Sequence, residues 1–304
     1  MKTAKFIWLN GKMVKWEEAK IHFLTHALHY GTGVFEGIRC YEGNPAPVIF
    51  RLDDHLKRLQ NSAKIMAIKL PYSIPEIKKA IVELVHENKL QQCYIRPLVF
   101  LGYGEMGLNP LPAPVQMGIA AWSWEHYLGA GAFEKGIKVK ISSWVRNSPD
   151  ALPPTAKISG AYANSVLAKR EALEEGYEDA ILLDGQGFVA EGTGENVFIV
   201  RDGILITPPI NNCLEGITRK SVIEIADHLG IKFHQKHMTR GELYTADECF
   251  FSGTAAELTP ITSIDHRTIG NGKVGPITKK IQGVYSEIVH NKRNEFSHWL
   301  TPVK

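Results

Sequence analysis

The segment Pro154-Thr155-Ala156-Lys157-Ile158-Ser159-Gly160-Ala161-Tyr162 places a lysine among small residues, directly before a stretch that is expected to be helical. The preceding prolines stiffen the chain, because the proline ring restricts backbone rotation. Gly160 lets another backbone segment come close. Most lysines lie on the protein surface, so it is this setting that singles out Lys157.

A second motif, Glu191-Gly192-Thr193-Gly194-Glu195-Asn196, places a carboxylate in a glycine-spaced turn. Glycines let the backbone approach a flat ligand, and a carboxylate can keep a pyridine nitrogen protonated. A lysine amine can attack an aldehyde. The two motifs together predict pyridoxal phosphate as cofactor. The alternatives are a surface lysine and a hairpin with a solvated glutamate. A dinucleotide fingerprint is excluded, since Val197 stands at its third glycine position.

Three further segments could bind the phosphate of this cofactor. Arg58 offers a guanidinium fork, and Gly216-Ile217-Thr218 is expected to begin a helix. The free amides of a helix start bind anions. Ser252-Gly253-Thr254 follows an expected strand. Each segment alone is common, but together with Lys157 and Glu191 they supply each contact that the cofactor requires.

Composition limits the class of protein. The chain has 304 residues, 44% hydrophobic and 22% charged, which is typical of an ordinary globular protein large enough for two lobes. The net charge of +3 with scattered Lys and Arg does not indicate a nucleic-acid partner. No apolar run approaches the roughly 20 residues that a membrane span needs, so no membrane partner is expected. The cysteines show no C-x-x-C spacing and the N-terminus has no signal-peptide region, so a cytoplasmic protein is expected.

The pattern along the chain predicts two domains. Residues 1–123 form the first, 124–136 a glycine-rich linker, and 137–304 the second. Asn10-Gly11 predicts a hairpin. Helical spacing and caps predict helices at 53–66, with Asp53 as N-cap, and at 75–88, 160–175, 216–229 and 276–290.

At the level of ordered motifs, the chain resembles the branched-chain amino acid aminotransferases, in the class IV, fold-type IV family of pyridoxal phosphate enzymes. The resemblance implies a mixed α/β (α+β type) two-domain enzyme with the cofactor in the interdomain cleft. Glu215 departs from the proline that some relatives carry before the Gly-Ile-Thr turn. Besides the motifs above, the blocks that carry the resemblance are His26-Ala27-Leu28-His29-Tyr30-Gly31, Val34-Phe35-Glu36-Gly37-Ile38-Arg39, Tyr94-Ile95-Arg96-Pro97-Leu98, Gly216-Ile217-Thr218-Arg219 and Ser252-Gly253-Thr254-Ala255-Ala256-Glu257.

The resemblance also implies roles at the cofactor. Lys157 forms the internal aldimine and shuttles the proton between substrate Cα and cofactor C4′. Tyr162 hydrogen-bonds the phenolic oxygen of the ring, and Glu191 pairs with the ring nitrogen. Leu214 packs on the ring face. The phosphate cradle comprises Arg58, Gly216, Ile217, Thr218, Ser252, Gly253 and Thr254.

The implied substrate pocket is apolar. Its wall comprises Tyr30, Phe35, Tyr94, Trp124 and Tyr127, with Met106 and Leu108 contributed by the partner subunit of a homodimer or a trimer of dimers. Arg96 meets the side-chain carboxylate of glutamate. Gly194 lies at the substrate, whose α-carboxylate binds the Tyr94 hydroxyl and the amides of Thr254 and Ala255.

The predicted reaction is transfer of the amino group of L-leucine, L-isoleucine or L-valine to 2-oxoglutarate, in a ping-pong sequence through Lys157. The alternatives share the fold: a D-amino acid or (R)-amine transaminase, or an aminodeoxychorismate lyase. No metal is predicted, because His22, His26 and His29 lack a fitting carboxylate partner set.

Overall fold

The computed structural model describes residues 3–124 and 131–303, which fall into two compact units. The first unit combines Met1–Glu125 with Ala156–Gly160 and Glu287–Lys304, and the second combines His126–Thr155 with Ala161–Ser286. This division differs from a contiguous second domain at 137–304, because strand pairing joins two later segments to the first unit. Residues 125–130 of the expected linker, including Tyr127, lie outside the described residues.

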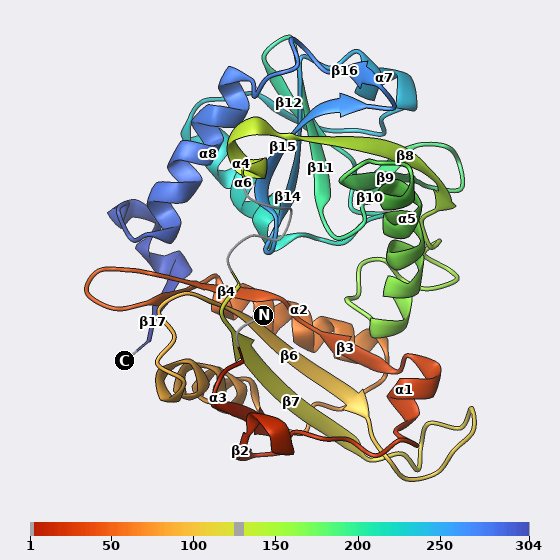
Figure 1. Ribbon diagram of the computed structural model, residues 1–304, viewed down its shortest axis with the longest axis vertical. Coiled ribbons are helices and arrows are strands. Elements are labelled where there is room, and N and C mark those ends of the chain that lie inside the picture. The colour runs from red at the N-terminus through yellow and green to blue at the C-terminus, as the bar shows by residue number, and fades with distance from the viewer. Residues whose placement is uncertain (1–2, 125–130, 304) are drawn as a thin grey trace. The chain divides into compact units, whose positions relative to one another are not determined.

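The first unit is built on an antiparallel sheet with the strand order β17-β5-β4-β6-β7-β1-β2, in which β3 also pairs with β6 (Figure 1). The predicted hairpin turn is confirmed, with positive φ at Asn10 and Gly11. The strands are β1 (Phe6–Leu9), β2 (Lys12–Lys15), β3 (Gly33–Phe35), β4 (Ile38–Tyr41), β5 (Val48–Phe50), β6 (Cys93–Leu101), β7 (Val115–Trp122) and β17 (Leu300–Pro302).

Helices α1 (His26–Tyr30), α2 (Leu52–Ile65) and α3 (Ile74–Glu87) belong to this unit, with short 3-10 turns at η1 (Trp16–Glu18) and η3 (Asn294–Trp299). A capping box between Ser73 and Glu76 begins α3, which contacts β1 and β7. Asp53 is not the N-cap of α2, so that prediction is wrong. Arg51 takes this position at φ 50°, because its backbone N–H donates to the Trp299 carbonyl and its guanidinium covers the Trp299 ring.

The second unit has a sheet of mixed direction with the order β10-β9-β8-β15-β14-β11-β12-β13, and β16 pairs with β15. Its core lies between the sheet and the segments packed on it, and includes Val197, Phe251 and Ile261. The strands are β8 (Ile137–Val145), β9 (Asp179–Leu183), β10 (Val189–Gly192), β11 (Asn196–Arg201), β12 (Ile204–Thr207), β13 (Phe233–Gln235), β14 (Glu248–Gly253), β15 (Glu257–Ile264) and β16 (Arg267–Thr268).

Two helices of the second unit matter for the site. Helix α5 (Tyr162–Glu174) packs on β8 and β9, and α6 (Ile217–His228) packs on β13 and β14, so they cover different strands of the sheet (Figure 1). The other elements are α4 (Ala132–Lys135), α7 (Arg240–Tyr244) and α8 (Pro276–Val289). The turn η2 (Ser159–Ala161) spans the division, with Ser159 and Gly160 in the first unit. The boundary between the units falls within α8.

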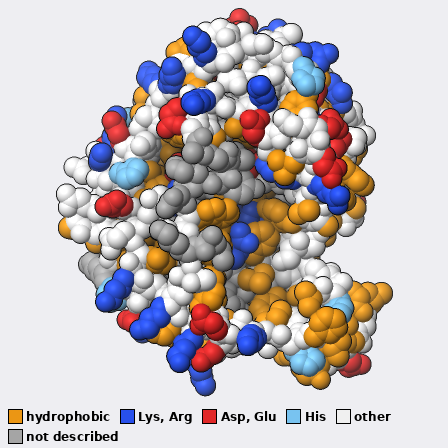
Figure 2. All heavy atoms as spheres, in the orientation of Figure 1, with side chains coloured by type: hydrophobic (Ala, Val, Ile, Leu, Met, Phe, Trp, Pro, Cys, Tyr) orange, Lys and Arg blue, Asp and Glu red, His pale blue; other side chains and the backbone are white. Residues whose placement is uncertain are grey.

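The surface carries both signs of charge. On the face shown in Figure 2, Lys and Arg side chains are interspersed with Asp and Glu side chains, as the net charge of +3 leads one to expect. Within residues 3–124 and 131–303, no helix is both long enough and apolar enough to cross a membrane. The same residues contain no group of three or more His, Cys, Asp or Glu side chains that could hold a metal ion.

Candidate functional site

The backbone of Lys157 is fixed on two sides within the first unit. The N–H of Phe35, at the end of β3, donates to the Lys157 carbonyl at 3.0 Å. The N–H of Lys157 donates to Ser62 Oγ on α2, also at 3.0 Å. Val34 and Ile158 form an antiparallel bridge next to it. Lys157 is therefore held by regular secondary structure and does not sit on a loose loop.

Two glycines make this close pairing possible. Gly160 donates its N–H to the Gly31 carbonyl at 3.1 Å. A Cβ added to Gly31 would lie 2.6 Å from Gly160 Cα, and the φ of Gly31 is +67°, which L side chains rarely adopt. The close backbone approach expected at Gly160 is thus present, and Gly31 is its partner.

The side chain of Lys157 is largely buried. It is 9% exposed, and its Nζ lies 5.0 Å from the centroid of the Phe35 ring. The alternative of a solvated surface lysine is therefore excluded. Lys157 therefore places its amine beside an aromatic face inside the protein.

Arg58 of α2 belongs to a buried polar cluster in the same unit. Its Nε donates to Glu36 Oε1 at 2.7 Å and its Nη2 to Glu36 Oε2 at 2.9 Å. His55 Nδ1 lies 2.7 Å from the same Oε2. Burial alone would raise the pKa of Glu36, but the charge of Arg58 and the hydrogen bond of His55 outweigh burial and lower it. Burial lowers the pKa of His55, so its ring is neutral near pH 7.

Sequence reasoning missed Glu36 and His55. Glu36 lies inside a motif block that was used only for the resemblance, and His55 stands three positions before Arg58 on α2. That i, i+3 spacing on a helix, together with a carboxylate between apolar neighbours, was the available signal.

Tyr94 and Arg96 project from the same face of β6, because side chains alternate along a strand. The Arg96 guanidinium lies 4.7 Å from the centroid of the Phe35 ring, and its Nη2 donates to the Tyr94 hydroxyl at 3.4 Å. Arg96 Nε is buried and has no hydrogen-bond partner among the described residues. Gly37 must be a glycine here, since a Cβ would overlap the Tyr94 hydroxyl.

Other predicted substrate residues divide into two groups. Trp124 packs against Tyr94 with the ring centroids 4.8 Å apart, so it joins the aromatic wall. Tyr30, Met106 and Leu108 are exposed by 41%, 38% and 84%. These three side chains are thus not enclosed within this chain.

Glu191 of β10 is buried in the second unit, being 4% exposed. Its Oε2 accepts hydrogen bonds from the Leu214 N–H at 3.0 Å and from Asn196 Nδ2 at 3.3 Å. Arg146 Nη2 lies 2.7 Å from Oε1, in an ion pair that lacks hydrogen-bond alignment. The alternative of a solvated glutamate is excluded. Arg146 was missed, because nothing near it in the sequence points to Glu191.

The start of α6 is connected to Glu191 through Asn196. Asn196 Nδ2 also donates to the Leu214 carbonyl at 2.9 Å, and Gly216 must lack a side chain because a Cβ would overlap Asn196. Among the residues that the structure describes, no side chain caps α6 at Gly216. As at the start of every α-helix, the first-turn amides of Ile217 and Thr218 have no intrahelical acceptor, and such amides can bind anions.

The hairpin between β14 and β15 lies next to this segment. Ser252 pairs with Asn196 across the strands, and the turn contains Thr254 and Ala255. Ser252 Oγ is buried and has no hydrogen-bond partner in the part of the chain that the structure describes. A buried hydroxyl without a partner fits a site that a polar ligand completes.

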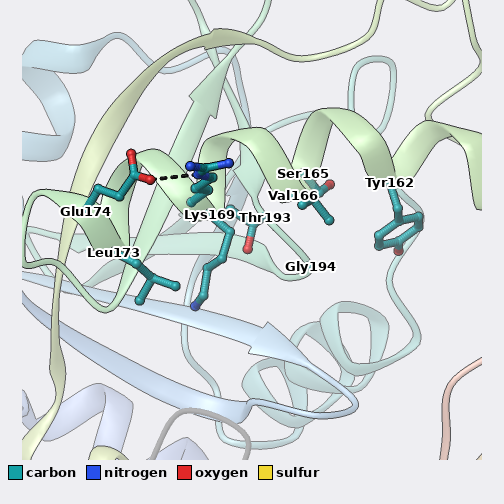
Figure 3. A pocket seen from close by; sticks show the side chains of 9 residues that line it. Tyr162, Ser165, Val166, Lys169, Leu173, Glu174, Thr193 and Gly194 are labelled. Atoms are coloured by element: carbon teal, nitrogen blue, oxygen red, sulfur yellow. Dashed lines mark hydrogen bonds and ion pairs between the residues drawn. The ribbon is translucent and has the colours of Figure 1, made fainter.

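A groove of about 460 Å³ runs along α5 in this unit (Figure 3). Tyr162 lies at one end, at the first residue of the helix, and Gly194 lies in the turn after β10. Two predicted site residues thus line one groove. Its other lining residues are Ser165, Val166, Lys169, Arg170, Leu173, Glu174 and Thr193.

Glu195 is a buried acid beside Glu191. Its Oε2 accepts a hydrogen bond from the Gly194 N–H at 2.9 Å. Asp179, itself fully buried, pairs with Lys169 at 2.7 Å and accepts a hydrogen bond from Thr193 Oγ1. Burial, and then the charge of Asp179, raise the pKa of Glu195 to about 8.

We expect Glu195→Gln to change how stability depends on pH. Because the folded pKa of about 8 exceeds the unfolded value of 4.5, the wild type loses stability as pH rises between these values. Glutamine does not ionise, so the variant should gain roughly 1–3 kcal/mol over the wild type from pH 5 to pH 8. Urea unfolding across this range measures it. The control is Glu134→Gln on the exposed side of α4; a difference independent of pH would contradict the prediction.

The family Amino-transferase class IV matches residues 33–264. The branched-chain-amino-acid aminotransferase of Salmonella typhimurium is 46% identical over 304 residues, covering 99% of this chain and 98% of that relative. The Pseudomonas aeruginosa protein of the same name is 48% identical over 298 residues, covering 98% and 97%.

Solved structures are similar over the same length. The crystal structure of the Escherichia coli branched-chain amino acid aminotransferase superposes with a TM-score of 0.97 at 45% identity, covering 99% of this chain and 100% of that one. The T.th. enzyme of the same name, complexed with N-(5′-phosphopyridoxyl)-L-glutamate, gives 0.96 at 48% identity, with 99% of each chain covered. The predicted family and the mixed α/β fold are confirmed. The chain belongs to the class IV aminotransferases, and within them to the branched-chain-amino-acid aminotransferase family.

Proposed function

We propose that this protein is a pyridoxal phosphate enzyme that transfers the amino group of L-leucine, L-isoleucine or L-valine to 2-oxoglutarate. The products are the branched 2-oxo acids and L-glutamate. Full-length relatives bearing the name branched-chain-amino-acid aminotransferase support the reaction. One observation supports the assignment of the cofactor. Buried Glu191 accepts a hydrogen bond from the Leu214 N–H, in the segment that leads into helix α6. The carboxylate that could pair with a pyridinium nitrogen is thus connected to the helix start that could bind a phosphate.

The residues present fit this cofactor. Glu191 would hold the ring nitrogen, Tyr162 the phenolic oxygen and Leu214 the ring face. The phosphate would be held by Arg58, Gly216, Ile217, Thr218, Ser252, Gly253 and Thr254. Ser252 Oγ, which has no hydrogen-bond partner among the described residues, and the first-turn amides of α6 offer donors for an anion. When bound, pyridoxal phosphate supplies an aldehyde carbon and an electron sink.

Lys157 carries the chemistry in this proposal. Its amine would be the nucleophile toward the aldehyde carbon of the bound cofactor and the base that takes the proton from substrate Cα. Glu191, held by Arg146, would keep the ring nitrogen protonated. Each substrate uses these groups in turn, as a ping-pong reaction requires.

The substrate side of the site follows from the aromatic wall. Phe35, Tyr94 and Trp124 suit a branched aliphatic side chain, whose burial is worth about 1.5–3 kcal/mol. Gly194, with the Tyr94 hydroxyl and the amides of Thr254 and Ala255, would face the α-carboxylate.

We also propose a homodimer as the minimal active unit, with a trimer of dimers as a larger form. Exposed Met106 and Leu108 would then close the pocket of the partner subunit. A fully active protein that elutes as a monodisperse monomer in size-exclusion chromatography would contradict this proposal.

The cytoplasm is the proposed location. Cys40, Cys93, Cys213 and Cys249 are all free thiols, as is usual in reducing compartments.

Arg96→Ala should impair glutamate more than leucine. The guanidinium can meet the side-chain carboxylate of glutamate, and such a charged hydrogen bond is worth about 1.5–3 kcal/mol. We therefore expect kcat/KM to fall about 10–100-fold for glutamate and 2-oxoglutarate, and less than about threefold for leucine. Arg96→Lys, which keeps the charge but not the fork, should lie between. Equal losses for both substrates would refute this role.

The experiment that tests the proposed function is a set of half-reactions. The absorbance of the bound cofactor is followed on addition of L-leucine, L-valine, L-glutamate, D-alanine or an (R)-amine. Bleaching by the three L-amino acids alone supports the proposal. Bleaching by D-alanine or the (R)-amine alone would contradict it and indicate a D-amino acid or amine transaminase.

A further inference from the structure

Glu36 is a buried carboxylate that the proposed chemistry does not use. Its side chain is completely buried, and both oxygens face one edge of the Arg58 guanidinium, with distances of 2.7 Å to Nε and 2.9 Å to Nη2. Because the guanidinium is planar, two parallel hydrogen bonds fix the orientation of the whole group. In a planar guanidinium that binds a carboxylate through Nε and Nη2, the hydrogens of Nη1 lie on a different edge.

His55 in turn holds Glu36. Its Nδ1 lies 2.7 Å from Glu36 Oε2, and the Gly37 N–H donates to the same oxygen at 3.3 Å. An ionised carboxylate only accepts hydrogen bonds, so Nδ1 of the neutral imidazole carries the proton. Glu36 is therefore fixed from two sides besides Arg58.

The same face of α2 also holds the Lys157 backbone. His55, Arg58 and Ser62 follow one another at helical spacing, and Ser62 Oγ accepts the Lys157 N–H. The Arg58 cluster and the lysine segment are thus attached to one rigid helix. Sites supported in this way keep their geometry better than sites on loops.

We propose that Glu36 is a positioning residue for the cofactor phosphate, acting through Arg58. By binding one edge of the guanidinium it directs the other N–H groups to the phosphate before the cofactor arrives. Ordering this long side chain in advance removes part of the conformational cost of binding. The inference rests on the proposed function, in which Arg58 binds the phosphate.

The test compares two ligands that differ only in the phosphate. Affinities of the full-length apoprotein for pyridoxal phosphate and for pyridoxal are measured by absorbance titration. For Glu36→Gln we expect the Kd of pyridoxal phosphate to rise about 10–100-fold, as when supporting groups of a ligand site are removed, and that of pyridoxal by less than about threefold. Glu83→Gln, an exposed change on α3, should alter neither.

The variant Arg58→Ala distinguishes the phosphate-binding role of Arg58 from the positioning role of Glu36. If it keeps the preference for pyridoxal phosphate, the phosphate role of Arg58 fails, and the inference with it. If Arg58→Ala loses the preference but Glu36→Gln keeps it, only the role of Glu36 fails. Equal weakening of both ligands by Glu36→Gln would mean a general structural role and would also overturn it. Should Glu36→Gln not fold, Glu36→Asp, which retracts the carboxylate, carries the same expectations.

Discussion

Lys157→Ala should abolish transamination and leave only weak, phosphate-anchored cofactor binding. The side chain is proposed as both nucleophile and proton carrier. A positioned acid-base group alone contributes about 10²–10⁴-fold, so we expect kcat to fall by at least about 10⁴-fold. Loss of the buried amine also removes the atom that borohydride reduction would join to the cofactor. Turnover assays and peptide mass mapping after reduction measure the two effects.

Lys57→Ala is the matched control for this variant. Lys57 is an exposed lysine of α2 in the same unit, so its removal should change neither turnover nor the labelled peptide. Appreciable turnover by Lys157→Ala, or labelling of another lysine in the wild type, would contradict the assignment of Lys157 as the catalytic lysine.

Glu191→Gln should have the second largest effect. The neutral amide no longer keeps the ring nitrogen protonated, so we expect kcat to fall about 10²–10³-fold, as when one preorganised electrostatic group is lost. The variant should also lose stability, because Arg146 would remain buried without its counter-charge, at a cost of about 3–5 kcal/mol. Turnover and urea unfolding report these losses separately.

A double variant distinguishes the two losses. Glu191→Gln combined with Arg146→Met removes both buried charges, so most of the stability should return. Activity should stay low, because the partner of the ring nitrogen is still absent. Recovery of activity together with stability would show that Glu191 matters only for folding.

Local patterns in the sequence predicted much of the fold. Helix α3 was expected at 75–88 and is found at Ile74–Glu87, since Pro75 and the apolar spacing of Ile77 and Ile81 act within one helix. The Asn10-Gly11 turn is likewise local. Asp53 failed as a cap for a reason outside its neighbourhood: Arg51 is held by Trp299, far along the chain.

The sequence by itself determined the family and the cofactor chemistry, because Lys157 and Glu191 stand in short motifs whose residue types and spacing do not depend on distant contacts. Only the tertiary structure decided what surrounds them. Arg146 forms an ion pair with Glu191, and Arg58 donates hydrogen bonds to Glu36, because folding brings these distant residues together. A buried charge needs a partner, and which residue supplies it depends on which strands and helices meet in the fold. Lys157 is thus identified by its neighbours in sequence and buried by its neighbours in space.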